Sequence, residues 1–384
     1  MLLAALAQVG SGALAAPVRT GLTTPQDTGM KQLVYIGGYS SKEAPGIRAA
    51  DFDPATGELS RLRLAAEITN PSFLVVHPNG KVLYAVSEVG AGTGRSGGLV
   101  SAFSVDRSTG LLHLLGSMDT EGGGPCHVSV DPSGRCLFVA NYGGGSTVSY
   151  ALDPAGAIAG RASFIQHEQR PGQRADRQEG PHAHGVHLDP SSRFLLVPDL
   201  GLDQIEVYRV SGDTAELTLV NHFQLPAGSG PRHLAFHPTM PVAYGINELD
   251  STISIMAWDD QAGTLRAVER VGTLPESFSD PNTTAEISAH PFGQFVFASN
   301  RGHDSIAVFR VQPGSGLLRP LGHVLSGGKV PRFFTLDPSG RWLLAANQQS
   351  GSLVVFPLDL EAGMPATSLP PVNTPSPTCL VFVP

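Results

Sequence analysis

Short apolar runs alternate with turn-forming residues along the chain from residue 70 onward. The run that ends at Val76 and the run that begins at Val82 are typical, and both are rich in β-branched and aromatic residues, which favour strands. The chain contains 45 Gly and 31 Pro among 384 residues, which disfavours long helices. The pattern therefore predicts an all-β protein.

A turn of the type His/Asp-Pro-x-Gly separates the two apolar runs of each pair. Pro presets φ for the first central position of such a turn, and Gly accepts a positive φ without a steric penalty. Successive prolines of this series lie 47 to 58 residues apart. The turns occupy residues 77–80, 131–134, 189–192, 237–240, 290–293 and 337–340, the third and fourth of them without the final Gly.

A second series of turns interleaves with the first and has seven members. These turns occupy residues 53–57, 106–110, 153–156, 211–214, 260–263, 313–316 and 359–363. Each repeat therefore holds two hairpins, and hence four strands, in about 50 residues. Four-stranded repeats of this length are typical of the blades of a β-propeller.

The two ends of the chain complete one blade between them. The C-terminal run 376–383 resembles every first strand but has no turn after it, whereas the run 32–37 resembles every second strand but has no first strand before it. We therefore expect a seven-bladed β-propeller, closed by pairing of the N- and C-terminal strands, as a single domain over residues 31–384. Two stacked domains of three or four blades are the structural alternative.

Superimposing the repeats on the turn proline aligns two sets of positions. Six residues before it lie Ser72, Cys126, His184, Arg232, Ala285 and Arg332. Ten residues after it lie Glu88, Tyr142, Leu200, Glu248, Arg301 and Gln348. Both sets fall at the same end of the hairpin, and the first strand of a blade lines the central channel, so both sets should surround one mouth of that channel.

This mouth has the composition of a functional site, and its leading candidates are His184, Arg232, Glu248 and Arg301. A structural role without chemistry stays open as the alternative, because Arg232 and Glu248 belong to one hairpin and could form a purely structural cross-strand ion pair. Polar channel ends also occur in propellers that only act as scaffolds.

Charge and cysteine content exclude several classes of function. Lys and Arg number 25 against 33 Asp and Glu, giving a net charge of −8, and no basic run occurs. Nucleic acids and anionic membranes are therefore poor candidate partners. No segment has 18 uninterrupted apolar residues, which argues against a membrane span. The three cysteines have no zinc-like spacing and are expected to be small buried side chains.

The histidines at positions 182, 184 and 187 form an H-x-H-x-x-H pattern. On a strand, His182 and His184 would share one face and could bind a metal, but no further carboxylate or histidine clearly joins them. We therefore expect no metal and no cofactor, and a polar or proton-transferring cluster instead. The polar loop before them, residues 166–180, is either a solvated insertion or a lid whose Arg170, Arg174 and Arg177 reach an anionic ligand.

Residues 1–30 differ from the rest of the chain. The stretch 1–16 is apolar, and residues 13–15 fit an A-x-A cleavage site, but no basic residue precedes the apolar run. This leader is either the remnant of an export signal or an extension upstream of a true start at Met30. The missing basic region favours a cytoplasmic protein, with export as the alternative.

Several motifs carry a resemblance to a known family. The segments GPRH at 230–233, NEL at 247–249 and SNRG at 299–302, together with PHAH at 181–184, resemble those of the seven-bladed lactonase family. That family contains bacterial propeller-type 6-phosphogluconolactonases and fungal carboxy-muconate cyclases. The resemblance covers residues 31–384, and its motifs point to the same four residues as the aligned positions.

The resemblance implies hydrolysis of a sugar lactone, most simply 6-phosphogluconolactone. We expect the enzyme to be a monomer. Alternatives are a lactone-forming cyclase and a non-catalytic propeller that binds a sugar or a protein. With no credible serine nucleophile, we expect direct attack by water, with His184 as general base. Glu248 would orient or replace it, or protonate the leaving group if its pKa is raised, while Arg232 and Arg301 bind an oxyanion and an anionic group. Further expected substrate contacts are Arg332, His182 and His127.

Overall fold

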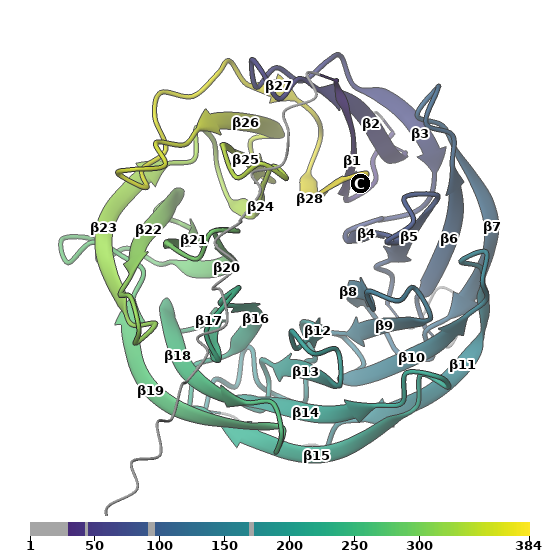
Figure 1. Ribbon diagram of the computed structural model, residues 1–384, viewed down its shortest axis with the longest axis horizontal. Helices are drawn as coiled ribbons and strands as arrows, with labels where there is room; N and C mark the ends of the chain where they lie inside the picture. The colour runs from purple at the N-terminus through teal and green to yellow at the C-terminus, as the bar shows by residue number, and fades with distance from the viewer. Residues whose placement is uncertain (1–29, 43–44, 91–96, 169–172) are drawn as a thin grey trace, which may run out of the picture.

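Seven four-stranded antiparallel sheets surround a central channel in the computed structural model of the protein (Figure 1). The structure describes residues 30–42, 45–90, 97–168 and 173–384. Every regular element within these ranges is a strand. The seven-bladed all-β architecture expected from the repeats is therefore confirmed, whereas residues 1–29 of the leader and Arg170 lie outside the described residues.

Each blade extends from an innermost strand at the channel to an outermost strand at the rim. In that order, the closing blade contains β28 (Pro377–Phe382), β1 (Gln32–Gly38), β2 (Gly46–Phe52) and β3 (Arg63–Glu67). The next contains β4 (Leu74–Val76), β5 (Val82–Ser87), β6 (Leu99–Val105) and β7 (Leu112–Asp119). The third contains β8 (Pro125–Val130), β9 (Cys136–Asn141), β10 (Ser146–Leu152) and β11 (Ile158–Gln166).

The remaining four blades repeat this order. They contain β12 (His187–Leu188), β13 (Phe194–Asp199), β14 (Gln204–Val210) and β15 (Leu217–Gln224); then β16 (Pro231–Phe236), β17 (Val242–Asn247), β18 (Thr252–Asp259) and β19 (Thr264–Gly272). They continue with β20 (Thr283–Ala289), β21 (Phe295–Arg301), β22 (Ser305–Val311) and β23 (Leu318–Leu325), and with β24 (Pro331–Leu336), β25 (Trp342–Asn347), β26 (Ser352–Pro357) and β27 (Val372–Asn373).

The ring closes as the two chain ends predict. Strand β28 pairs with β1 in antiparallel register, with Val34 opposite Phe382 and Ile36 opposite Leu380. Leu380 and Ile36 are both buried, so the closing pair contributes to the core as well as to the sheet. The sheet edge that β1 would otherwise expose is thereby covered.

The recurring His/Asp-Pro turns link neighbouring blades. Nε2 of His77 lies 3.1 Å from the carbonyl oxygen of Gly134 in the next blade, and His237 and His290 make the same contact with the following turns at 2.9 Å. The turn glycines adopt positive φ, as at Gly80 with φ 66°, and Ser192 takes that conformation at φ 58° where the repeat lacks Gly. The turn chemistry thus serves both the hairpin and the contact between blades.

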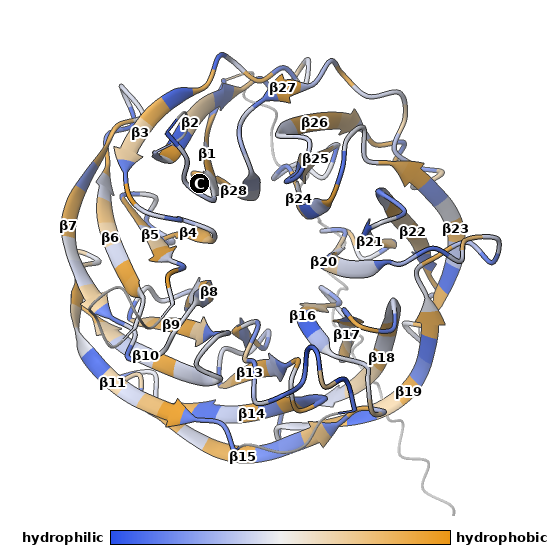
Figure 2. Ribbon diagram, turned by 180° about the vertical axis from the view of Figure 1, so that it is seen from behind, coloured by the Kyte–Doolittle hydropathy of each residue, from blue (hydrophilic) through white to orange (hydrophobic). Residues whose placement is uncertain are grey.

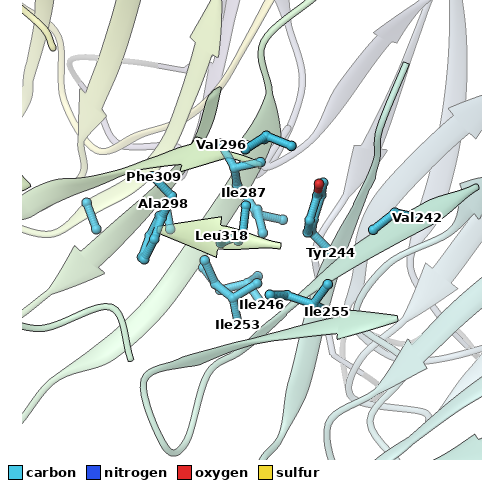
Figure 3. Packing of buried hydrophobic residues seen from close by; sticks show 12 residues of the cluster. Val242, Tyr244, Ile246, Ile253, Ile255, Ile287, Val296, Ala298, Phe309 and Leu318 are labelled. Carbon is cyan, nitrogen blue, oxygen red and sulfur yellow. The ribbon is translucent and has the colours of Figure 1, made fainter. Parts of the chain in front are cut away.

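The hydrophobic core lies between adjacent blades. Figure 3 shows one such layer, in which Tyr244 and Ile255 of one blade pack with Val296 and Phe309 of the next. The outermost strands face water and alternate in hydropathy, as in β15 (Figure 2). Burial of this repeated layer gives the ring its rigidity, and the innermost strands are left to line the channel.

The innermost strands carry an irregularity at a fixed place. The pairing register shifts around Cys126 in β8, Arg232 in β16, Arg332 in β24 and Thr378 in β28, so that one extra residue is inserted there. In β20 the shift falls between Thr284 and Ile287. β-Bulges of this kind redirect side chains near functional sites. In β8, β16 and β24 the bulged residue is therefore the one six residues before the turn proline.

No helix that is long and apolar enough to cross a bilayer occurs in the part of the chain that the structure describes.

Candidate active site

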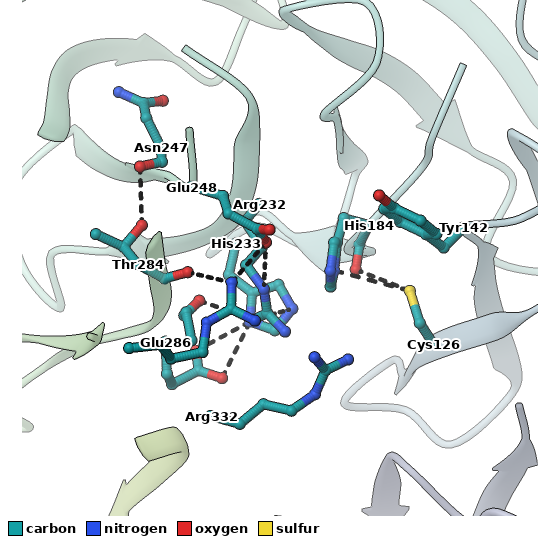
Figure 4. Close-up of polar contacts among 12 residues, drawn as sticks. Cys126, Tyr142, His184, Arg232, His233, Asn247, Glu248, Thr284, Glu286 and Arg332 are labelled. Atoms are coloured by element: carbon teal, nitrogen blue, oxygen red, sulfur yellow. Dashed lines mark hydrogen bonds and ion pairs between the residues drawn. The ribbon is translucent and has the colours of Figure 1, made fainter. Parts of the chain in front are cut away.

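Glu248 pairs with Arg232 and Arg301 at one mouth of the channel, and His184 lies beside this group, close to His233. Figure 4 shows His184, Arg232 and Glu248 together. Arg232 comes from the bulge in β16, Glu248 directly follows β17, and Arg301 ends β21. His184 precedes β12, which contains only two residues. The expected histidine-bearing strand is thus mostly an extended segment, held by a bridge between Ala183 and Asp199 and by a 2.9 Å bond from the His184 N–H to Pro198.

The Glu248 carboxylate is the centre of an arginine cluster. Its Oε2 lies 2.9 Å from a terminal nitrogen of Arg301 and 3.3 Å from Nε of Arg232. Its Oε1 accepts a 2.6 Å hydrogen bond from Arg177. The Glu248 side chain is only 4% exposed, so these charges interact with little screening by water. The cluster carries two more positive charges than negative ones.

The backbone of β20 holds two of these arginines, Arg232 from the neighbouring blade and Arg301 from the same blade. Arg232 donates a 2.7 Å bond to the carbonyl oxygen of Ala285, and Arg301 donates a 2.6 Å bond to that of Thr284. Both carbonyls belong to the irregular part of β20. In each arginine the buried Nε has no hydrogen-bond partner among the described residues, although Nε of Arg232 remains within ion-pair distance of Glu248. The guanidinium groups therefore retain donor capacity for an anionic ligand.

The charge states of this cluster follow from its geometry. Burial raises the pKa of Glu248, but Arg301, Arg232 and Arg177 lower it more, to about 2. Burial lowers the pKa of Arg232 to about 10. Both groups are consequently charged at neutral pH. Protonation of a leaving group by Glu248, which requires a raised pKa, does not fit these values.

His184 is a neutral imidazole beside the cluster. It is 5% exposed, and its Nδ1 lies 3.7 Å from Sγ of Cys126. Its ring centroid lies 5.2 Å from that of Tyr142 and 5.3 Å from that of His233. Burial, followed by the charge of Arg232, holds the pKa of His184 well below its ordinary value. The uncharged ring can accept a proton at neutral pH.

Arg332 lies at the same mouth. A terminal nitrogen of Arg332 donates a 3.2 Å bond to the Tyr39 hydroxyl, which donates a 2.8 Å bond to Glu88. Burial lowers the pKa of Arg332, but Tyr39 and Glu88 raise it more, above its ordinary value. Arg332 is therefore a further fixed cation.

His182 lies against Tyr142 at the same mouth. Its ring stacks on Tyr142 at 4.5 Å, its Nδ1 lies 2.9 Å from the Tyr142 carbonyl oxygen, and its Nε2 lies 3.2 Å from Glu179. Within the described ranges, no group of three or more histidine, cysteine or acidic side chains is arranged to hold a metal ion. His182 and His184 have separate partners instead.

His127 lies deeper in the channel than the other candidates. Its ring is 4.8 Å from both His187 and His233, and it lines a cavity of about 830 Å³ that is otherwise mostly apolar. That cavity also contacts the turn prolines Pro132 and Pro190, so it opens toward the opposite end of the channel. A chain of ring contacts leads from His184 through His233 to His127.

Two groups at this site were missed by the sequence reasoning, namely His233 and Glu286. Both lie five residues before the turn proline, next to the bulged position. Regular strand alternation would turn such residues away from the channel, whereas the bulge lets neighbours in sequence face it together. The adjacent motif GPRH contains His233, but nothing in the spacing distinguishes it from a core residue. Arg177 was expected only as one of three loop arginines.

Comparison with known proteins identifies relatives that match most of the chain. Residues 33–382 match the family model described as lactonase, seven-bladed β-propeller. A 6-phosphogluconolactonase of Bacillus subtilis is 33% identical over 354 residues, covering 92% of this chain and 99% of its own length. A 6-phosphogluconolactonase of Formosa agariphila is 34% identical over 336 residues, covering 86% of this chain and 93% of its own.

A solved structure shares the fold closely. The Pseudomonas aeruginosa periplasmic gluconolactonase PpgL superimposes with a TM-score of 0.85 and 31% sequence identity, over 92% of this chain and 99% of its own. Both the sequence match and the superposition extend over nearly the whole propeller. The chain belongs to the seven-bladed β-propeller lactonase family.

Proposed function

We propose that the protein hydrolyses a sugar lactone, 6-phosphogluconolactone, to the open-chain acid at the mouth that contains Glu248. The observation that carries this proposal is the arginine cluster around one buried carboxylate, with the neutral His184 imidazole beside it. An anionic sugar lactone needs such a local excess of positive charge in a chain whose net charge is −8.

In the proposed reaction, water attacks the lactone carbonyl carbon while His184 accepts a proton from it. The bond from this carbon to the ring oxygen then breaks, and the ring oxygen takes up a proton to become a hydroxyl group, while the new carboxylic acid keeps the second water proton and loses it to solvent at neutral pH. Arg232 and Arg301 are fixed donors, and one of them stabilises the negative charge that develops on the carbonyl oxygen. General-base assistance contributes about 10²–10⁴-fold in rate in known enzymes.

Glu248 has a positioning role in this scheme. Its pKa of about 2 keeps it ionised, and its two oxygens hold Arg177, Arg232 and Arg301 in a fixed arrangement. We assign it neither the base nor the acid of the reaction. Arg332 and His182, at the same mouth, are proposed substrate contacts, and so is His127 at the deeper level.

Comparing two related substrates shows whether the protein prefers a phosphorylated or an unphosphorylated lactone. The Bacillus subtilis relative is named for a phosphorylated lactone, and the Pseudomonas aeruginosa relative for gluconolactone. The test is hydrolysis of both lactones by purified protein, measured as acid release above the spontaneous rate. A higher kcat/KM for the phosphorylated lactone supports the proposal. Equal rates would assign a neutral lactone, and no rate above the background would favour the binding or cyclase alternatives.

A further inference from the structure

A buried acid–base pair lies next to the arginine cluster. Nδ1 of His233 is 3.0 Å and 3.1 Å from the two carboxyl oxygens of Glu286 (Figure 4). Oε1 of Glu286 also accepts a 3.0 Å bond from the Ile287 N–H. The side chains of His233 and Glu286 are 2% and 10% exposed, respectively. The pair is therefore almost completely withdrawn from water.

Charged and titratable groups from several blades face this pair. One terminal nitrogen of Arg232 lies 3.3 Å from both ring nitrogens of His233. The rings of His127, His184 and His187 lie 4.8, 5.3 and 5.5 Å from that of His233. Arg332, Glu248 and Cys379 also lie near enough to interact electrostatically with one member of the pair.

These surroundings place a proton on the carboxyl group. Burial raises the pKa of Glu286 to about 7, although Arg232 opposes the shift. Burial, followed by Arg232 and His187, holds the pKa of His233 well below its ordinary value. Near neutral pH the pair thus shares one proton, which Glu286 donates to Nδ1 of His233, and this leaves the ring proton on Nε2.

Ester hydrolysis requires a proton for the leaving oxygen as well as a base for water. Glu248 cannot supply that proton, because its pKa is about 2. Building on the lactonase function proposed above, we propose that the Glu286–His233 pair is the acid of the reaction. As the bond from the carbonyl carbon to the ring oxygen breaks, Nε2–H of His233 passes its proton to that oxygen, and the Glu286 proton moves to Nδ1.

The protons balance over one turnover. Water gives one proton to His184, and the pair gives one proton to the new hydroxyl group, leaving Glu286 as a carboxylate. The second proton of the water stays on the new carboxylic acid, whose ionisation at neutral pH gives the single proton that lactone hydrolysis releases. The proton on His184 then returns to the pair. His184 and His233 lie 5.3 Å apart between ring centroids, so base and acid act on the same bound lactone.

The test is the pH dependence of kcat for wild type and Glu286→Gln, with the spontaneous rate subtracted. The glutamine amide still reaches His233 but cannot ionise. We expect a wild-type kcat that falls as pH rises through about 7, and a variant kcat lowered about 10²-fold or more without that ionisation. KM should change by less than about threefold, because the pair acts on the leaving group rather than on ground-state binding.

His233→Gln provides a second, independent variant. It should lower kcat to a similar extent and remove the same ionisation, and the double variant should be no slower than either single one, since the two residues act as a unit. Circular dichroism spectra establish that each variant is folded. If wild type is active and folded Glu286→Gln or His233→Gln keeps the kcat and pH profile of wild type, this inference is overturned while the proposed function stands. A wild type without lactonase activity overturns the proposed function instead.

Discussion

Arg177 donates a 2.6 Å hydrogen bond to Oε1 of Glu248, although Arg177 lies on the loop between β11 and β12 and Glu248 follows β17 of another blade. Arg177 also donates a 3.3 Å bond to the Tyr142 hydroxyl. With 31% of its side chain exposed, it is the outermost of the three arginines around Glu248. It thus spans the mouth between Glu248 and the tyrosine beside His184.

Arg177→Met tests whether this arginine recognises the phosphate group. We expect KM for 6-phosphogluconolactone to rise about tenfold or more, because a hydrogen bond to a charged group contributes about 1.5–3 kcal/mol. KM for unphosphorylated gluconolactone should stay nearly constant. Steady-state kinetics with the two lactones measures both effects.

Arg174→Ala is the matched control for that substitution. Arg174 lies on the same loop, but its side chain is 46% exposed and bonds Asp176 of the same turn. Its KM values should equal those of wild type. Equal increases in KM for both lactones in Arg177→Met would instead show that Arg177 does not select phosphate.

Glu248→Gln should destabilise the fold in a pH-dependent manner. The folded-state pKa of about 2 lies below the ordinary value of 4.5, so ionised Glu248 stabilises the protein above that ordinary value, and the contribution is lost as pH falls toward 2. Breaking a buried ion pair costs about 3–5 kcal/mol. Melting temperatures should therefore differ most near neutral pH and converge in acid. A difference independent of pH would contradict the assigned ionisation.

Removal of residues 376–384 tests the importance of the closing strand. The deletion removes β28, including Cys379 and Leu380, which are both buried, and exposes the edge of β1. We expect aggregation or a large, cooperative loss of thermal stability, because open strand edges pair with other chains. A monomeric product that melts at the wild-type temperature would be incompatible with this role of β28.

The start of the mature chain bears on where the enzyme acts. The sequence pattern favours a cytoplasmic protein with a start at Met30, and export is the alternative; the Pseudomonas aeruginosa relative is named as periplasmic. Amino-terminal sequencing of the native protein should give Met30 as the first residue. A start at Ala16, after the A-x-A triplet, would indicate cleavage and export instead.

The repeat pattern was sufficient to predict the ring, its closure and the mouth, because turn chemistry repeats with the blades. Arg232, Glu248 and Arg301 meet there because equal offsets from the turn fall at equal heights in each blade. Glu286 was not predictable in this way, because a bulge breaks the two-residue alternation from which the direction of each side chain is inferred. Arg177 reaches the site from a loop without a repeat, so no offset could place it.

The central claim, that a lactone is opened at the mouth beside Glu248, is tested most directly by turnover of 6-phosphogluconolactone in wild type and His184→Ala. The rate of spontaneous hydrolysis is subtracted from both. We predict wild-type turnover well above the background and a kcat lowered about 10²-fold or more in the folded variant, the usual scale for a lost acid–base group. Equal kcat values in the two folded proteins would contradict the claim.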